Sequence, residues 1–307
     1  MKQRGVALIM AIVMVAIATV LAVRIGTRAS LDQRRTAGLI ALDQAWHVAL
    51  GAEAWASEVL RKDREDSETD HLGENWAQPI PPLPVDGGAV RGALEDMQGR
   101  FNLNNLLKDD GTVNESAIAR FERLLENAGA DQRWARITAD WLDSDTVPGF
   151  PDGAEDGNYL SQNPPYRSAN GPVTTITELM ALPGMTLDEY QRIRPYVAAL
   201  PLGSTINICT ALAPVLAALV EGGTDFGDAD SLLANRRDGC FPTMEDLQAT
   251  LPTEVFQLLR PAISDSSDWF RVVTAVSIGT SELTLYSLIE RNSVGGSRTV
   301  LRSTGTE

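Results

Sequence analysis

The chain of 307 residues has few histidines and cysteines and an excess of acidic over basic side chains. His47 and His71 alone argue against a histidine-rich metal site or a Ser-His-Asp triad. Two cysteines exclude a disulfide-dense scaffold and allow one bridge. The 26 Lys and Arg against 41 Asp and Glu give a formal net charge of −15. This charge argues against a nucleic-acid binder, which needs a basic face to neutralise phosphates.

Common enzyme motifs are also missing. The sequence contains no GxSxG, phosphate loop, HExxH, dinucleotide fingerprint or CxxC. Carboxylate pairs such as Asp140 with Asp143 are compatible with hydrolase chemistry, but such pairs arise by chance among 41 acids. Residues 177–197 are similar to a helix-hairpin-helix, yet acids flank this unit and we expect it to pack rather than to bind DNA. These features favour a structural protein over an enzyme.

A long uncharged run begins at the sixth residue. Val6–Val23 contains eighteen residues without a charge, and Thr19 is its only polar side chain. A helix of this length spans about 27 Å, close to the hydrocarbon thickness of a bilayer. Few core helices are apolar on every face, so we expect a membrane span rather than a buried core helix.

Three kinds of membrane segment compete for this run: a cleaved signal peptide, an uncut anchor and a type IV prepilin-like leader. The basic leader, with Lys2 and Arg4, ends at Gly5, and the apolar run follows at once, which favours the third. No proline occurs over 24–61, so the helix is expected to continue beyond the span. Its predicted apolar face comprises Leu31, Leu39, Leu42, Trp46, Leu50 and Ala54. Arginines follow the span, so charge leaves the orientation open.

The soluble part divides into three zones by pattern. A proline-rich connector over 71–88 precedes a predicted hairpin of Ala89–Leu94 and Gln98–Leu103. Helical periodicity follows over 114–200, with an irregular segment predicted over 143–172. The last third predicts short helices and then strands, over 212–219, 228–235, 244–250, 269–278, 282–291 and 294–304.

Several segments together resemble the minor pseudopilin K family of type II secretion systems, within the type IV pilin-like superfamily. The resemblance covers essentially the whole chain and rests on Arg4–Met10, Gly99–Leu106, Trp141–Asp156, Ile206–Ala211 and Phe270–Val276. It implies an α+β, pilin-like fold, in which a long N-terminal helix packs on an antiparallel sheet and a large α-domain is inserted. The expected parts are a leader (1–5), a span (6–23), the helix, linker and first strands (24–110), the α-domain (111–205) and the remaining pilin-like part (206–307).

The resemblance gives meaning to the residues around the leader. It implies cleavage between Gly5 and Val6 by prepilin peptidase and methylation of the new Val6 amine. The fifth residue after the cut is glutamate in most pilin-like proteins, and here it is Met10. A buried carboxylate in lipid needs an opposite charge, thought to be a neighbour's amine. The absence of this glutamate is explained in one of two ways. The helix is an ordinary membrane span, or the chain is a tip subunit with no neighbour ahead, as the K family implies.

One acidic, Pro/Gly-rich segment is a candidate metal site. Its acids are Asp143, Asp145, Asp152, Glu155 and Asp156. Hard oxygen ligands at short spacing suit Ca²⁺, although the spacing is not that of an EF-hand. A solvated acidic loop is the alternative, and the K family's calcium-binding α-domain favours Ca²⁺. In an oxidising periplasm, Cys209 and Cys240 are expected to form a disulfide rather than remain buried thiols.

We therefore expect a non-enzymatic tip subunit of the periplasmic pseudopilus, anchored once in the bacterial inner membrane. The resemblance implies partners among minor pseudopilins of the I and J classes, with the H class as a further candidate. It also implies contact with prepilin peptidase and with exported proteins, and no nucleic acid. The alternatives are a type IV pilus minor pilin and an uncut, membrane-anchored periplasmic enzyme or binding protein.

Overall fold

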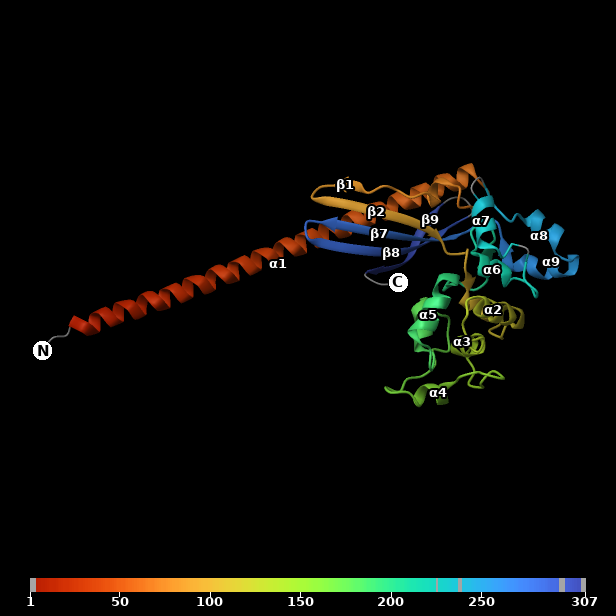
Figure 1. The fold of residues 1–307 in the computed structure, drawn as a ribbon, viewed down its shortest axis with the longest axis horizontal. Coiled ribbons are helices and arrows are strands. Elements are labelled where there is room, and N and C mark those ends of the chain that lie inside the picture. The colour runs from red at the N-terminus through yellow and green to blue at the C-terminus, as the bar shows by residue number, and fades with distance from the viewer. Residues whose placement is uncertain (1–3, 225, 237–238, 293–295, 305–307) are drawn as a thin grey trace.

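One helix of 63 residues, α1 (Arg4–Asp66), dominates the N-terminal part of the chain. The computed structural model describes residues 4–224, 226–236, 239–292 and 296–304. Figure 1 shows the first part of α1 projecting alone and its last part lying along a sheet. In the described residues, α1 is the one helix long and apolar enough to cross a membrane. As expected, it continues from the apolar run into the soluble part without a break.

The face of α1 that meets the sheet agrees only in part with the predicted one. Its fully buried apolar residues are Ala45, Ala49, Ala56 and Leu60. Of the predicted apolar face, Leu31, Leu39, Leu42 and Ala54 are exposed, whereas Trp46 and Leu50 are half-buried against the sheet. Three of the four fully buried residues are alanines, whose small side chains allow the helix axis to come close to the sheet.

The sheet has five antiparallel strands in the order β1-β2-β7-β8-β9. Their bounds are β1 (Leu83–Val85), β2 (Gly88–Asp96), β7 (Trp269–Ile278), β8 (Ser281–Arg291) and β9 (Ser297–Thr304). Every second residue of β7 is buried, as expected for a strand covered on one face by a helix. The predicted last three strands are confirmed, except that the start of the third, at Val294, lies outside the described residues.

The predicted hairpin of Ala89–Leu94 with Gln98–Leu103 is wrong. The strand β2 pairs instead with β1 and, over its whole length, with β7. The hairpin turn lies earlier, at Asp86-Gly87, where Gly87 has a φ of +79°. An Asp-Gly pair is typical of a two-residue hairpin turn because glycine adopts positive φ without strain. Downstream of β2, only β3 (Phe101–Asn102) is extended, and it pairs in parallel with β4 (Val197–Ala198).

A helical region lies between β2 and β7 in the sequence and at the end of the sheet remote from the N-terminus (Figure 1). The predicted helices around Phe121 and Trp134 are confirmed as α2 and α3. The α-helices are α2 (Glu115–Asn127), α3 (Trp134–Leu142), α4 (Asp156–Leu160), α5 (Leu187–Ile193), α6 (Ala213–Ala217), α7 (Ala229–Asn235), α8 (Met244–Thr250) and α9 (Thr253–Leu259). The 3-10 turns are Asn75–Ala77, Leu103–Leu106, Ile176–Ala181, Arg194–Tyr196 and Arg260–Ala262, and one more parallel pair joins β5 (Ile206–Asn207) to β6 (Ile263–Ser264).

One hydrophobic core unites this helical region. It includes buried side chains from Phe101 through Ile263, with Phe121, Trp134 and Leu216 fully enclosed. Buried residues between Ile206 and Ile263 therefore pack with the helices rather than with the sheet, so this core extends past both boundaries expected at 111 and 205. The chain has to continue to β6 before it returns to the sheet, since α6 to α9 cover the same core.

A buried polar network fixes the base of the helical region to the sheet. Asp96, the last residue of β2, accepts hydrogen bonds from the side chains of Asn207, Ser267 and Thr210. The Asn207 amide also donates to the backbone carbonyl of Asp70, at 2.9 Å. Burial raises the pKa of Asp96, against the lowering effect of the hydrogen bonds from Thr210 and Ser267. Because every partner is buried, the network restricts how the two parts move relative to one another.

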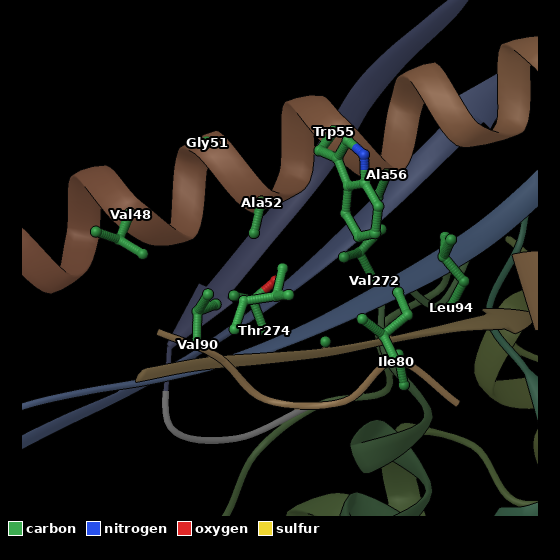
Figure 2. Close-up of a pocket in the computed structure, with 13 residues that line it drawn as sticks. Val48, Gly51, Ala52, Trp55, Ala56, Ile80, Val90, Leu94, Val272 and Thr274 are labelled. Carbon is green, nitrogen blue, oxygen red and sulfur yellow. The ribbon is translucent and has the colours of Figure 1, made fainter. Parts of the chain in front are cut away.

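An apolar groove remains open between α1 and β2. Figure 2 shows the indole of Trp55 hanging from α1 over the groove, opposite Ile80 and Val272. On the α1 side the groove is lined by the small residues Gly51 and Ala52, which leave it open. On the strand side it is lined by Val90 and Leu94. Trp55 is 48% exposed, which is high for a tryptophan that faces apolar side chains.

Candidate metal centre

Two glycines fold the loop after α3 back onto the end of that helix. The Gly149 amide donates to Asp140 Oδ2 at 2.9 Å, and the Gly153 amide donates to the Gly149 carbonyl at 2.6 Å. A Cβ at Gly149 would lie 2.8 Å from Asp140 Oδ1, and one at Gly153 would collide with Asp140 Oδ2 and the Gly149 backbone. The loop therefore needs glycine at position 153, whereas a side chain at position 149 would require Asp140 to shift. The return of the loop brings Asp143, Asp145 and Glu155 together.

Three carboxylates converge at this point. Asp143, Asp145 and Glu155 each offer an oxygen, and these oxygens lie within 4.8 Å of one another. Asp143 and Glu155 are 6% and 4% exposed, whereas Asp145 faces solvent. Asp143 Oδ1 and Glu155 Oε1 are buried without a hydrogen-bond partner. An unpaired buried carboxylate oxygen is costly, so the arrangement requires a proton or a cation.

The electrostatics of the three acids agree with that requirement. Burial raises the pKa of Asp143 to about 6, with a further contribution from the negative charges of Asp145 and Asp140. Burial and the neighbouring carboxylates Asp140, Asp143 and Asp145 raise the pKa of Glu155 to about 7. Each like charge makes ionisation of the next carboxyl less favourable. A bound divalent cation would reverse this effect.

The residues fit Ca²⁺ in kind and in spacing, and they supply part of its coordination shell. Calcium takes six to eight oxygens at about 2.3–2.6 Å in flexible geometry, so ligands on opposite sides of the ion lie up to about 5 Å apart. The three carboxylates match that spacing, and backbone carbonyls or water can complete the shell. Asp143, Asp145 and Glu155 would hold the ion.

Two of the five predicted ligands lie outside this group. Asp152 is exposed, and Asp156 Oδ1 instead accepts from the Ser168 amide and hydroxyl at 3.2 and 3.3 Å. Arg167 also lies 3.5 Å from Asp156. Sequence reasoning missed Asp140, which is 2% exposed and positions the loop through Gly149. Its spacing of three residues from Asp143, at the end of a helix, was the available signal.

A second group of acids already has a cation from the chain itself. Asp63, Asp70 and Glu74 also lie within 4.8 Å of one another. Arg291 donates to Asp63 at 3.0 Å and to both oxygens of Asp70. Burial, together with the charges of Glu74 and Asp70, raises the pKa of Asp63 to about 7. The group therefore ties the end of α1 to β8 through a buried guanidinium.

A disulfide joins Cys209 to Cys240 in the structure, as expected, and neither cysteine is a free thiol. The bridge links the segment after β5 to the segment before α8, with the two Cα atoms 4.6 Å apart. Arg236 is buried beside it and donates to the carbonyls of Ile208, Ala211 and Phe241. Covalent and polar links thus fix this part of the helical core.

At the other end of the molecule, α1 presents the residues expected around the leader. Val6 and Met10 are 58% exposed, and no acid occurs over 6–23. Gly5 belongs to α1, whereas residues 1–3 of the predicted leader lie outside the described residues.

A long N-terminal helix, apolar at its start and packed by its end on an antiparallel sheet, defines a pilin-like protein, here with an inserted helical region. Models of the family "Type II secretion system (T2SS), protein K" match residues 99–202 and 206–264. The chain belongs to this family.

Named relatives match over nearly the full length. Type II secretion system protein K of Pseudomonas aeruginosa is 36% identical over 99% of this chain and 93% of its own. The protein of the same name from Pectobacterium carotovorum is 33% identical over 97% and 98%. A chain of the crystal structure of the GspK-GspI-GspJ complex from the enterotoxigenic Escherichia coli type 2 secretion system superposes with a TM-score of 0.78. That chain is 26% identical, and the match covers 89% of this chain and all of that one. The expected fold class and family are thereby confirmed.

Proposed function

We propose that this chain is the minor pseudopilin at the tip of a periplasmic pseudopilus. The observation that carries the proposal is the position of the helical region, at the end of the sheet remote from the N-terminus (Figure 1). A subunit stacked above would have to occupy the space taken by α2 to α9. A chain of this shape ends a filament, and from that position it would initiate assembly, limit growth or contact exported proteins.

The span supports the same position. Met10 stands where most pilin-like chains carry glutamate, and no acid replaces it within Val6–Val23. A carboxylate at this depth is stable only beside an opposite charge, such as the amine of the subunit ahead. A tip subunit has no subunit ahead, so an apolar residue is the favourable choice.

Processing and location follow from the N-terminal sequence. Prepilin peptidase would cut between Gly5 and Val6, and the Val6 amine would be methylated. The span would then anchor the chain once in the inner membrane, with the soluble part in the periplasm. Cys209 and Cys240 support that compartment, since disulfides persist in oxidising surroundings.

The proposed partners are other minor pseudopilins. The similar solved structure is, by its title, a complex of GspK with GspI and GspJ. Homologues of these two would bind this chain, with the H class as a further candidate. Exported proteins would meet the helical region.

A non-enzymatic role is part of the proposal. The chain has two histidines, and His47 lies on the exposed part of α1, 3.9 Å from Asp43. His71 lies 3.6 Å from Glu74, away from the converging acids of the loop. Neither histidine is bonded to a serine or cysteine nucleophile in the described part of the chain.

We also propose that Asp143, Asp145 and Glu155 bind one Ca²⁺. The two unpartnered buried oxygens and the raised pKa values support this proposal. Calcium would neutralise the cluster and stabilise the loop after α3. Its role would be structural: it would link Asp143, at the end of α3, to Glu155, at the start of α4.

Two measurements test the tip assignment. The N-terminal peptide of membrane-extracted chain should begin at a methylated Val6; a start at Met1 would indicate an uncut anchor, and a start beyond Ala22 a secreted protein. Gold labelling of an epitope-tagged chain should mark one end of overproduced pseudopili. Label along the whole filament would contradict the tip position.

A further inference from the structure

The part of α1 just beyond the apolar run has the opposite charge to the rest of the soluble chain. Four arginines and one acid, Asp32, occur over 24–35. Residues 36–307 contain 20 Lys and Arg against 40 Asp and Glu, a formal net charge of −20. The positive charge is therefore confined to the stretch nearest the end of the span, beside the phosphate groups of the lipid head groups.

Two of these arginines lie on one side of the helix. Arg24 and Arg28 are separated by four residues, which places them about 40° apart around an α-helix and one turn apart along it. Both are exposed. Two guanidiniums in this position can donate to the same phosphate group, and guanidinium suits phosphate because its donors are planar and forked.

Their depth matches the head groups of a bilayer. Arg24 follows Val23 directly, and Arg28 lies about 7.5 Å beyond Val23 along the helix axis. The polar layer on each side of a bilayer is roughly 5–7 Å thick. Both side chains reach it, whereas Arg34 and Arg35 begin about 17 Å beyond Val23 and lie outside it.

Carboxylates of the chain do not satisfy these arginines. In the part of the chain that the structure describes, neither Arg24 nor Arg28 forms an ion pair with a carboxylate. Asp32 is one turn beyond Arg28, also on the exposed helix, and is not bonded to it. The two guanidiniums are free to bind an external anion.

We propose that Arg24 and Arg28 form a binding site for the phosphate of an anionic phospholipid. The proposal rests on the membrane anchor proposed above, and it adds a ligand class and two binding residues. Bound there, the lipid fixes the height of α1 in the membrane before assembly. The acidic remainder of the chain is repelled by the same surface and stands away from it, which leaves the sheet and the helical region accessible to partners.

The test compares lipid binding by the full-length chain and two double variants. Each protein is reconstituted into vesicles of phosphatidylcholine alone or with 30% phosphatidylglycerol, and the lipids retained on the protein are counted by native mass spectrometry. R24Q/R28Q should reduce the preference for phosphatidylglycerol roughly 30-fold, since each arginine near an anionic surface contributes about 1 kcal/mol. R34Q/R35Q removes the same charge farther from the head groups and should reduce it less than about threefold.

The outcomes separate the inference from the anchor. Wild-type chain that does not insert into either kind of vesicle during reconstitution would overturn both. Stable insertion with no preference for phosphatidylglycerol, or equal losses in the two double variants, would overturn the binding site alone. R24K/R28K keeps the charge and should keep most of the preference, which excludes a general effect of substitution in α1.

Discussion

Arg302 of β9 holds the buried carboxylate of Glu53 on α1 by two parallel hydrogen bonds. Its Nε donates to Oε2 at 2.8 Å and its Nη2 donates to Oε1 at 2.7 Å. The hydroxyls of Thr299 and Ser287 donate to the same carboxylate. The carboxylate therefore connects the helix to the last two strands of the sheet, and every one of its partners is a donor.

Glu53→Gln should destabilise the full-length chain by about 1–3 kcal/mol at neutral pH, because a charge-assisted, bidentate contact is lost. Burial raises the pKa of Glu53, but hydrogen bonds from Arg302, Ser287 and Thr299 outweigh it, so this pKa lies below its usual value of 4.5. The stabilisation is thus fully present above pH 4.5 and is lost as the pH falls through the lowered value. Urea unfolding of both proteins between pH 3 and 8 measures this difference.

Glu58→Gln is the matched control for that experiment. Glu58 lies on the same helix and pairs with Arg61, but in an exposed position. We expect no measurable change in unfolding at any pH. A difference between Glu53→Gln and wild type that stayed constant down to pH 3 would contradict the assigned role of the ionised carboxylate.

Calcium should raise the melting temperature of the chain, and chelation should lower it. At a calcium concentration 100 times its Kd, the stabilisation is about 2.7 kcal/mol. Asp143→Asn and Glu155→Gln should abolish this response, because each removes a ligand charge. Asp152→Asn removes a neighbouring exposed acid outside the converging group and should leave it intact. Calorimetry with and without calcium gives the result; an equal response in all variants would exclude the proposed ligands.

The two sides of the same loop offer a second pair of variants. Gly153→Ala should destabilise the loop and weaken calcium binding, because the added methyl would collide with Asp140 and with the Gly149 backbone. Gly157→Ala, in α4, meets no atom within 4 Å and should be neutral or slightly stabilising. Isothermal titration with calcium compares them. Equal affinities would show that the close return of the loop is not needed for the site.

Replacement of two tryptophans, one on α1 and one beside it, should lower the free energy of unfolding by different amounts. Trp76 is 2% exposed and meets the ring of Phe270 edge-on, with centroids 5.2 Å apart, so Trp76→Ala should cost about 3–5 kcal/mol. Trp55 is 48% exposed above the groove in Figure 2, and Trp55→Ala should cost no more than about half as much. Urea unfolding measures both. Equal losses would mean that the groove is closed in solution.

Much of the fold could be predicted because its signals are local. The apolar run, the period of α2 around Phe121 and the alternation of β7 each depend on a few consecutive residues. The buried face of α1 could not be predicted in the same way. Ala45 and Ala49 are buried because the sheet comes close to them, and that sheet is built largely of residues more than 200 positions away.

The sequence indicated the segment in which acids converge, but not which of its acids come together. Asp143, Asp145 and Glu155 converge only because Gly149 and Gly153 fold the loop back onto Asp140, which spacing alone does not show. Asp156, next to Glu155, points to Ser168 instead. Proximity in the sequence marked the segment, and the path of the backbone determines which of its acids converge.

The helical region leaves the sheet after Asp96 and returns at Trp269, and Asp96 pairs directly with Phe270. Its two ends therefore meet at neighbouring positions of one strand pair. A segment joined in this way can lengthen, shorten or be exchanged in evolution without moving a single backbone hydrogen bond of the sheet. The part formed by α1 and the sheet and the inserted helical region can thus diverge at different rates within one gene.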